Sequence, residues 1–508
     1  MSQFFGSTFW RAIAVMAILY GLALVGYDSD VDGMILLGLV AGSSILAYKR
    51  LDHALLLVFI ELFSNPHGVL LTHIVGGFSL TLRMAIFVGV MLGWGMGVLT
   101  KKYWLEHKGE IAKIYYLLIL AATLGLIVGV LSRDPAVVFG DGNAYLYLFY
   151  LLPILSVDWN MTRRGELIQV LAAGAIWISS LSLILLYIFT HFGESVLQAT
   201  YYFFRDLRVA EITSLGHGVY RVFIQSQVFV IIFGLLLTSF LVFKRDRRLM
   251  LLGSLIISTI ILALSRSFWV GLVPTVLFLL ILLWRQLRPT LKQSFKFVGS
   301  ALSVGIVSIF LIALVILCSV PSQDLTGSDL ALTLKERTTD SDDVAISSRW
   351  KLLTPMVNKI FERPLTGHGF GASVTFVTDD PRVREIHPDG TWTTSSMEWG
   401  WFELWIKMGI LGPAAFLYAA WELLKRLWAY RWTEQAWLGF GLMSGLVFIF
   451  ATHFFSPYLN HPIGLGYLLF LVPFLPTKKP AEAVVGVSVP LNLGRQQVSV
   501  LTSDINVS

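Results

Sequence analysis

Several arginines lie at the ends of long apolar runs, where a guanidinium group is costly to place. Arg266 lies in "LSRSFWVG", Arg221 in "GVYRVFIQSQ" and Arg83 in "SLTLRMAIF". An arginine near hydrocarbon either extends its charge to the lipid headgroups or holds a ligand. Guanidinium groups bind phosphate oxygens through paired hydrogen bonds, so three that converge at one depth suit a polyanion such as a pyrophosphate.

The composition indicates a protein that is embedded in a lipid bilayer. Hydrophobic residues make up 56% of the 508 residues, charged residues 14%, and the mean hydropathy is +0.73. A bilayer requires about 20 apolar residues for each helical crossing, and the chain has many such runs. We therefore predict an all-α polytopic membrane protein rather than a soluble all-α protein. The single cysteine, Cys318, excludes an intramolecular disulfide, and no Cys/His cluster has the spacing of a zinc site.

Fourteen apolar segments are predicted as helices. They are 9–26, 33–48, 52–64, 84–100, 114–132, 143–159, 167–191, 220–243, 247–264, 267–284, 297–320, 399–424, 434–454 and 461–476. The third segment is short, so we expect about 12 to 14 membrane crossings.

Basic residues occur on every second connection between these helices. Examples are "YKR" at 48–50, "KK" at 101–102 and "KRDRR" at 244–248. By the positive-inside rule these connections and both termini are cytoplasmic. The same excess of Lys and Arg explains a pI of 9.2 without nucleic acid as a partner. Six arginines then fall on the outer side, where the rule expects few: Arg83, Arg133, Arg205, Arg208, Arg221 and Arg266.

The predicted helices divide the chain into four parts. These are the transmembrane helices of 1–320, one large external loop domain at 321–398, the C-terminal transmembrane helices of 399–476 and a cytoplasmic tail at 477–508. The external domain begins with a polar stretch and later carries the glycine-rich turn "TGHGFGAS", which contains His368. Such a turn either presents backbone N–H groups to an anion or simply ends a helix.

Two ion pairs are predicted within the helices. Glu403 and Lys407 are four residues apart on one helix, which is the spacing at which side chains meet. Glu61 lies near the outer end of its helix and is the expected partner of Arg83.

Short motifs in the second half of the chain occur in a characteristic order. "SSRWKLL", "FERPLTGHGFG" and "EWGWFELWIKMGILG" follow many helices and an "SR" at the outer start of one helix. In this order, over about residues 200–475, the chain resembles the O-antigen ligase and O-antigen polymerase family of bacterial envelope glycosyltransferases. The resemblance implies a bacterial inner-membrane enzyme that transfers a glycan from an undecaprenyl-pyrophosphate carrier to an acceptor sugar hydroxyl. Transfer would take place at the periplasmic face, so the external segment 321–398 is a periplasmic loop domain, and neither metal nor cofactor is expected.

The resemblance also assigns substrate-binding positions. Arg221 matches the arginine that faces the carrier pyrophosphate in the family, and Arg266 matches the second such arginine. Arg83 and Arg349, the latter in "SSRWKLL", are further substrate-binding candidates.

At the position of the general base, the chain departs from the family pattern. Many members have a histidine eleven residues before a Gly-x-x-Gly turn, and counting back from Gly409 gives Glu398. A carboxylate can accept the proton of a hydroxyl, so Glu398 is a catalytic candidate, with His387 and His368 as rivals. The alternative is that Glu398 is only a favourable charge at the start of a helix.

Two classes of function are compatible with the sequence. The first is glycan transfer, with an undecaprenyl-pyrophosphate-linked glycan, an acceptor glycan or lipid A core, and the lipid bilayer as partners. The second is a transporter or flippase of a lipid-linked or anionic solute, whose path the same arginines would line. The chain has no clear repeat and its unusual charges lie in the outer leaflet, which favours transfer. Ligase and polymerase differ in the acceptor and stay open.

Overall fold

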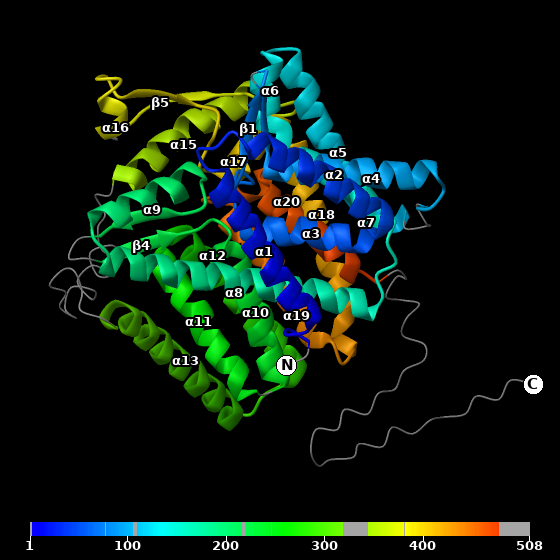
Figure 1. Ribbon diagram of the computed structural model, residues 1–508, viewed down its shortest axis with the longest axis vertical. Helices are drawn as coiled ribbons and strands as arrows, with labels where there is room; N and C mark the ends of the chain where they lie inside the picture. The colour runs from blue at the N-terminus through cyan, green and yellow to red at the C-terminus, as the bar shows by residue number, and fades with distance from the viewer. Residues whose placement is uncertain are drawn as a thin grey trace, which may run out of the picture.

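The computed structural model describes residues 3–76, 78–104, 109–215, 219–244, 246–318, 344–379 and 381–476. These residues are mostly helical (Figure 1), which confirms the predicted all-α membrane class. The polar start of the external segment, 321–343, and the predicted tail, 477–508, lie outside the described residues.

Eight helical segments within the described residues are long and apolar enough to cross a membrane. They are α1 (Ser7–Gly26), α2 (Asp32–Lys49), α4 (Leu82–Leu99), α5 (Gly109–Val130), the segment Pro135–Leu155, α8 (Met161–His191), α12 (Arg266–Leu287) and α13 (Leu291–Leu317). Pro135–Leu155 consists of α6 (Pro135–Gly142), the 3-10 helix η1 (Asn143–Tyr150) and α7 (Leu151–Leu155). These helices have the length and composition needed to cross a bilayer. The total of about 12 to 14 crossings stays a prediction.

The described residues form further helices, most of which are shorter. They are α3 (Leu51–Ser64), α9 (Glu194–Asp206), α10 (Gln227–Phe243), α11 (Arg247–Ala263), α15 (Val344–Glu362), α16 (Pro381–Arg384), α17 (Gly400–Met408), α18 (Leu411–Leu427), α19 (Ala436–Thr452) and α20 (Pro462–Leu471), with 3-10 turns η2 (Trp428–Trp432), η3 (Tyr458–Asn460) and η4 (Val472–Phe474).

The predicted helix 399–424 is broken in two. Gly409 separates α17 from α18 with a φ of 63°, a backbone conformation that residues with a Cβ avoid. A Cβ at this position would lie 2.0 Å from the carbonyl oxygen of Leu365. The break therefore lets the turn after α15 pack directly against the chain between α17 and α18.

Within the described residues, three antiparallel hairpins accompany the helices: β1 (Thr72–Val75) with β2 (Phe78–Thr81), β3 (Glu211–Ser214) with β4 (Tyr220–Phe223), and β5 (Val374–Val377) with β6 (Thr391–Thr394). The second hairpin corrects the prediction of a helix over 220–243. In its register Thr213 lies opposite Arg221, and the helix begins only at Gln227. The β-branched and aromatic residues of "YRVF" are typical of strands, which explains the difference.

The helix α8 forms the centre of the bundle. It packs against α1, α3, α10 and α11, and α10 also packs against α19. Residues along nearly all of α10 and α19 are buried, so these two helices are surrounded by protein. By contrast α13 buries only three residues and packs mainly on α11, at the edge of the molecule (Figure 1).

The described part of the external segment has a small hydrophobic core of its own. It consists of Leu352, Met356, Ile360, Ala372, Val374, Met397, Trp399 and Ile406. Figure 1 shows α15, β5 and α16 grouped at one end of the molecule. Because Trp399 and Ile406 belong to this core, the segment is joined to the membrane helices through α17.

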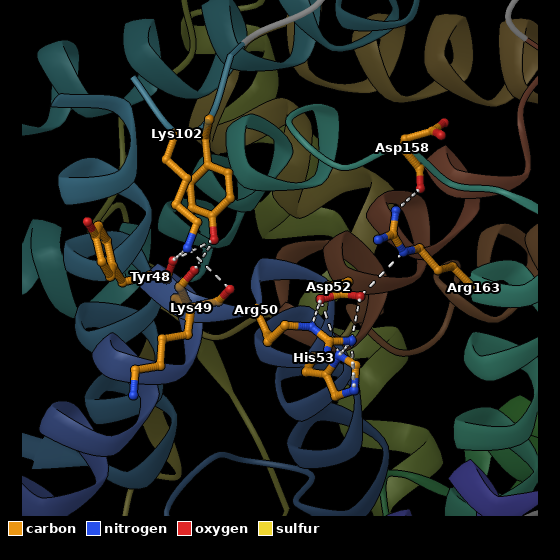
Figure 2. Close-up of polar contacts among 10 residues, drawn as sticks. Tyr48, Lys49, Arg50, Asp52, His53, Lys102, Asp158 and Arg163 are labelled. Carbon is orange, nitrogen blue, oxygen red and sulfur yellow. Dashed lines mark hydrogen bonds and ion pairs between the residues drawn. The ribbon is translucent and has the colours of Figure 1, made fainter. Parts of the chain in front are cut away.

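Several basic connections meet at the other end of the helices, which we call the basic end (Figure 2). Lys102 Nζ donates to the carbonyl oxygen of Tyr48 at 2.7 Å, and the guanidinium of Arg163 lies 3.3 Å from Asp52. Arg163 also donates to the Asp158 carbonyl at 2.6 Å. Three of the connections predicted to share one side of the membrane, at 48–50, 101–102 and 163–164, therefore lie at the same end of the helices.

Candidate functional site

The connections opposite the basic end enclose a cavity of about 500 Å³. We call this end the site end; it contains the loop after α3, the connection from α9 through β4, the α11–α12 junction and the α19–α20 connection. The polar residues that line the cavity are His67, Tyr201, Arg205, Arg208, Glu211, Thr213 and Gln225. Two guanidinium groups outnumber the one carboxylate among them, so the cavity favours an anionic ligand.

The amphipathic helix α9 supplies one wall of this cavity. None of its residues is fully buried, and it carries both aromatic and charged side chains. Arg205 is held by Asp206 at 2.9 Å and lies 4.8 Å from the ring centre of Tyr202. Arg208 follows with a φ of 48°, an uncommon backbone conformation for a residue other than glycine. The chain thus turns sharply at the point where the two arginines enter the cavity wall.

The arginine of β4, Arg221, joins the cavity wall to the start of α12. Its Nε donates to the carbonyl oxygen of Ala263 at 2.9 Å, and its guanidinium lies 3.7 Å from the cavity residue Glu211. The group also lies 4.8 Å from the ring centre of Phe223. Arg266 is the first residue of α12, three positions after Ala263. The structure therefore brings Arg221 to the junction that carries Arg266. This contact is needed if the two arginines bind the same ligand.

Arg83 lies behind the cavity wall. Its Nε is 3.0 Å from Glu61 Oε2, which confirms the predicted pair, and both side chains are buried. Its terminal nitrogens donate to the carbonyl oxygens of Asn65 and Pro66. The donors of Arg83 are thus directed at the protein, unlike those of an arginine that faces a ligand.

Glu398 and Arg349 form an ion pair on the surface of the external segment. Nε of Arg349 lies 2.5 Å from Oε2 of Glu398, and the glutamate side chain is 49% exposed. The indole Nε1 of Trp399 donates to the Arg349 carbonyl at 2.8 Å, which fixes the start of α17 against α15. Two residues that the sequence suggested separately, one as a base and one as a substrate ligand, therefore touch each other.

His368 is buried in the glycine-rich turn. Its Nε2 lies 2.8 Å from the carbonyl oxygen of Lys359, and its own carbonyl accepts a hydrogen bond from Arg133 at 2.5 Å. Burial lowers the pKa of His368, and the hydrogen bond to Lys359 opposes this only in part. The contacts of its ring and backbone link α15 to the end of α5.

Five successive backbone N–H groups of the same turn, those of residues 367–371, are engaged within the protein. Residues 367, 368, 369 and 370 donate to the carbonyl oxygens of Arg363, Ile406, Lys407 and Gly125. The N–H of Gly371 donates to Asp141 Oδ2 at 2.7 Å. A Cβ on Gly369 would lie 2.2 Å from the nitrogen of Gly129. Close packing against α5 and α17, rather than anion binding, thus accounts for the glycines of this turn.

His387, the third catalytic candidate, lies apart from these contacts. Its ring is exposed and is 6.3 Å from the ring of Trp392 on β6. No group of three or more His, Cys, Asp or Glu side chains able to hold a metal occurs among the residues that the structure describes.

A buried charge cluster ties α17 to the N-terminal half of the chain. Lys407 pairs with Glu403, as its spacing predicts, and also lies 2.5 Å from Asp141 on α6. All three side chains are largely withdrawn from solvent. Since an isolated charge is expensive to bury, each member depends on the others.

The α19–α20 connection, 453–461, links the two parts of the site end. Trp401 stacks edge-on against His453, and a Cβ on Gly400 would lie 2.3 Å from the His453 carbonyl. Burial and the Glu211 carboxylate raise the pKa of Tyr458, against the opposing effect of Arg221. The ring of His461 lies 5.5 Å from that of His67. This connection therefore touches both the external segment and the cavity wall.

The cavity includes residues that the sequence did not nominate. Neither His67, in "SNPHG", nor Glu211 is among the site candidates predicted from the sequence, and only the contacts between distant segments place them at the cavity. Arg205 and Arg208 carried a signal, because they are among the arginines on the side where the orientation rule expects few.

The fold and the site define a multi-pass helical membrane protein with a basic cavity at one end. Residues 251–417 match the family model described as O-antigen ligase. The chain thus carries an O-antigen ligase domain, and the family resemblance predicted from its motifs is confirmed. The matched segment includes Arg266, Arg349 and Glu398. No curated protein and no solved structure matches the chain.

Proposed function

We propose that this protein is a glycosyltransferase that moves a glycan from an undecaprenyl-pyrophosphate carrier to an acceptor sugar hydroxyl. The observation that carries the proposal is the contact of Arg221 with the junction before Arg266, at the edge of a cavity that holds two further arginines. The family match over 251–417 supports the same chemistry. The acceptor is lipid A core for a ligase and another glycan for a polymerase.

The proposed reaction requires stabilisation of a leaving pyrophosphate. The acceptor oxygen forms a bond to the anomeric carbon while the bond from that carbon to the pyrophosphate oxygen breaks. The electron pair of the broken bond leaves with undecaprenyl pyrophosphate. Cationic donors that are already in position stabilise this developing charge without reorganisation. Arg221 and Arg266 are the proposed donors.

The proton of the acceptor hydroxyl needs a base, for which we propose Glu398. Arg349 binds Oε2 of the carboxylate and orients it, so Oε1 can accept the proton. His387 and His368 are the rival bases. His368 is disfavoured because its Nε2 is bonded to Lys359 and its ring is buried.

We further propose that the protein lies in a bacterial inner membrane with its basic end and both termini in the cytoplasm. The excess of Lys and Arg at that end is the supporting observation. The cavity and the external segment then face the periplasm, where lipid-linked glycans would meet their acceptors.

The test is transfer by purified protein in detergent or liposomes. Undecaprenyl-pyrophosphate-linked glycan is incubated with lipid A core or with a second portion of the same glycan, and the products are separated by mass. A new glycosidic bond to either acceptor supports the proposal, and the acceptor used distinguishes ligase from polymerase. Movement of the lipid-linked glycan across a liposome membrane, with no new bond, would instead establish the transporter alternative.

A further inference from the structure

The turn after α3 is fixed from both sides by buried polar contacts. Asn65 donates to Glu61 Oε1 at 3.0 Å, and the N–H of Gly68 donates to Asn65 Oδ1 at 3.1 Å. The N–H of Arg83 donates to the Gly68 carbonyl at 3.1 Å. A Cβ on Gly68, whose φ is 79°, would lie 2.6 Å from the Cβ of Arg83. The turn therefore rests directly on the first residues of α4.

The Arg83 guanidinium completes this arrangement. It contacts both carboxylate oxygens of Glu61 through Nε and the carbonyl oxygens of Asn65 and Pro66 through its terminal nitrogens. Arg83 is only 7% exposed. A planar group with five N–H donors can hold a carboxylate and two carbonyls at once, whereas an ammonium cannot match that geometry.

One residue of the turn is exposed while its neighbours are buried. Asn65, Pro66 and Gly68 are buried, and His67 opens into the cavity that contains Arg205 and Arg208. The His67 ring is accessible from the cavity, yet protein crowds its other sides. That crowding lowers the pKa of His67, and the charges of Arg83 and Arg208 lower it further. The imidazole is therefore neutral at pH 7, with one N–H donor and one acceptor nitrogen.

We propose that His67 contacts the diphosphate group of the donor inside this cavity, and that the buried Glu61–Arg83 pair is the device that positions it. This inference rests on the proposed function and adds a substrate contact and a positioning residue to it. His67 acts as a neutral hydrogen-bond donor in the cavity that Arg205 and Arg208 also line. Arg83 acts through the turn and does not touch the ligand.

The first measurement is equilibrium binding of undecaprenyl pyrophosphate to the purified full-length protein. A hydrogen bond to a charged group predicts that His67→Ala weakens binding about tenfold to a hundredfold. The matched control is His53→Ala, which changes a histidine at the basic end and should leave binding unchanged. Unaltered binding in His67→Ala would overturn the proposal.

The second measurement separates positioning from direct binding. Arg83→Lys removes the planar fork, and the paired variant Glu61→Leu/Arg83→Met replaces the buried ions by apolar groups without leaving one charge alone. Either should weaken binding about as much as His67→Ala. Combining either with His67→Ala should add nothing, because both changes remove the same contact. Additive losses in both combinations would mean that Arg83 has its own contact with the ligand, and would overturn the positioning role.

Titrations with different ligands test whether His67 contacts the diphosphate or the lipid part of the donor. Inorganic pyrophosphate and undecaprenol are titrated beside undecaprenyl pyrophosphate. Loss of inorganic pyrophosphate binding in His67→Ala would support a contact with the diphosphate itself, whereas loss of undecaprenol binding in the same variant would overturn it. These experiments measure binding and not transfer. Absence of glycan transfer would refute the proposed function, and the binding results would still decide whether His67 contacts the diphosphate.

Discussion

Arg349 and Glu398 are 49 positions apart in the sequence, and Nε of the first lies 2.5 Å from Oε2 of the second. The pair joins α15 to a residue two positions before the start of α17, so the two halves of the external segment meet at a charged contact. A carboxylate held at one oxygen keeps a defined orientation for a second partner.

If Glu398 is the base, Glu398→Gln should reduce turnover about a hundredfold or more and leave donor binding nearly unchanged, because the amide keeps its shape and loses proton affinity. The measurement is the rate of glycan transfer at saturating donor. Asp379→Asn is the control, since Asp379 is a comparably exposed carboxylate that pairs with Lys351. Normal turnover in Glu398→Gln, with a loss of only about 0.3–1 kcal/mol in stability, would mean that Glu398 is only a favourable charge near the start of α17.

Arg221→Ala and Arg266→Ala should each abolish detectable transfer while insertion into the membrane is retained. Lysine at either position should restore little activity, because an ammonium lacks the planar fork that matches a pyrophosphate. Transfer assays on purified variants with unchanged elution in size-exclusion chromatography test this. Arg384→Ala, which removes an exposed ion pair with Asp379, should transfer normally. Full activity in either Arg221→Ala or Arg266→Ala would refute its proposed role.

Gly369→Ala should lower the stability of the protein by about 2–3 kcal/mol, because a left-handed backbone and a clash coincide at this position. The new Cβ would lie 2.2 Å from the backbone of α5. Gly299→Ala in α13 meets nothing within 4 Å and should be neutral or slightly stabilising. Thermal unfolding in detergent compares the two. Equal unfolding temperatures of the two variants would contradict the prediction and show that the turn can move away from α5 without loss of stability.

The lowered pKa of His368 predicts a pH dependence of stability. The unfolded chain takes up a proton near pH 6.5, and the folded protein does so only at a lower pH. Stability is therefore fully present above pH 6.5 and falls as the pH drops from 6.5 towards the folded pKa. Unfolding temperatures measured from pH 7.5 to 5 should fall less steeply in His368→Gln than in the unchanged protein. Parallel curves would exclude this contribution.

The orientation predicts opposite labelling of the two ends. In a Cys318→Ser background, cysteine at exposed Glu385 should react with a membrane-impermeant thiol reagent in intact spheroplasts. Cysteine at exposed Thr100, at the basic end, should react only after permeabilisation. The reverse pattern would place the cavity in the cytoplasm and contradict a periplasmic reaction.

Much of the bundle can be read from the sequence, because bilayer length and apolar runs determine it. The predicted helix 247–264 corresponds to α11 (Arg247–Ala263), and the pairs Glu61–Arg83 and Glu403–Lys407 form as expected. The break at Gly409 is missed because hydropathy is the same on both sides of it. The conformation is imposed by the carbonyl of Leu365, which is a tertiary contact.

Less of the candidate site can be predicted from the sequence, because tertiary contacts decide it too. The arginines are visible as charges at unexpected positions, but the partners that decide their roles come from elsewhere in the chain. Arg83 turns out to face Glu61 and the turn that presents His67. Local patterns indicate which charges are unusual, and only the packing of distant segments determines whether each one faces the ligand or the protein.

The buried cluster of Asp141, Glu403 and Lys407 has a consequence for biosynthesis. Asp141 and Lys407 are separated by 266 positions, so at a translation rate of about 5–20 residues per second roughly 13–50 seconds pass between their synthesis. During that interval α6 has left the ribosome without the cation that its carboxylate requires. The N-terminal helices consequently cannot adopt their final arrangement at Asp141 before α17 arrives, and the last third of the chain completes the fold of the first.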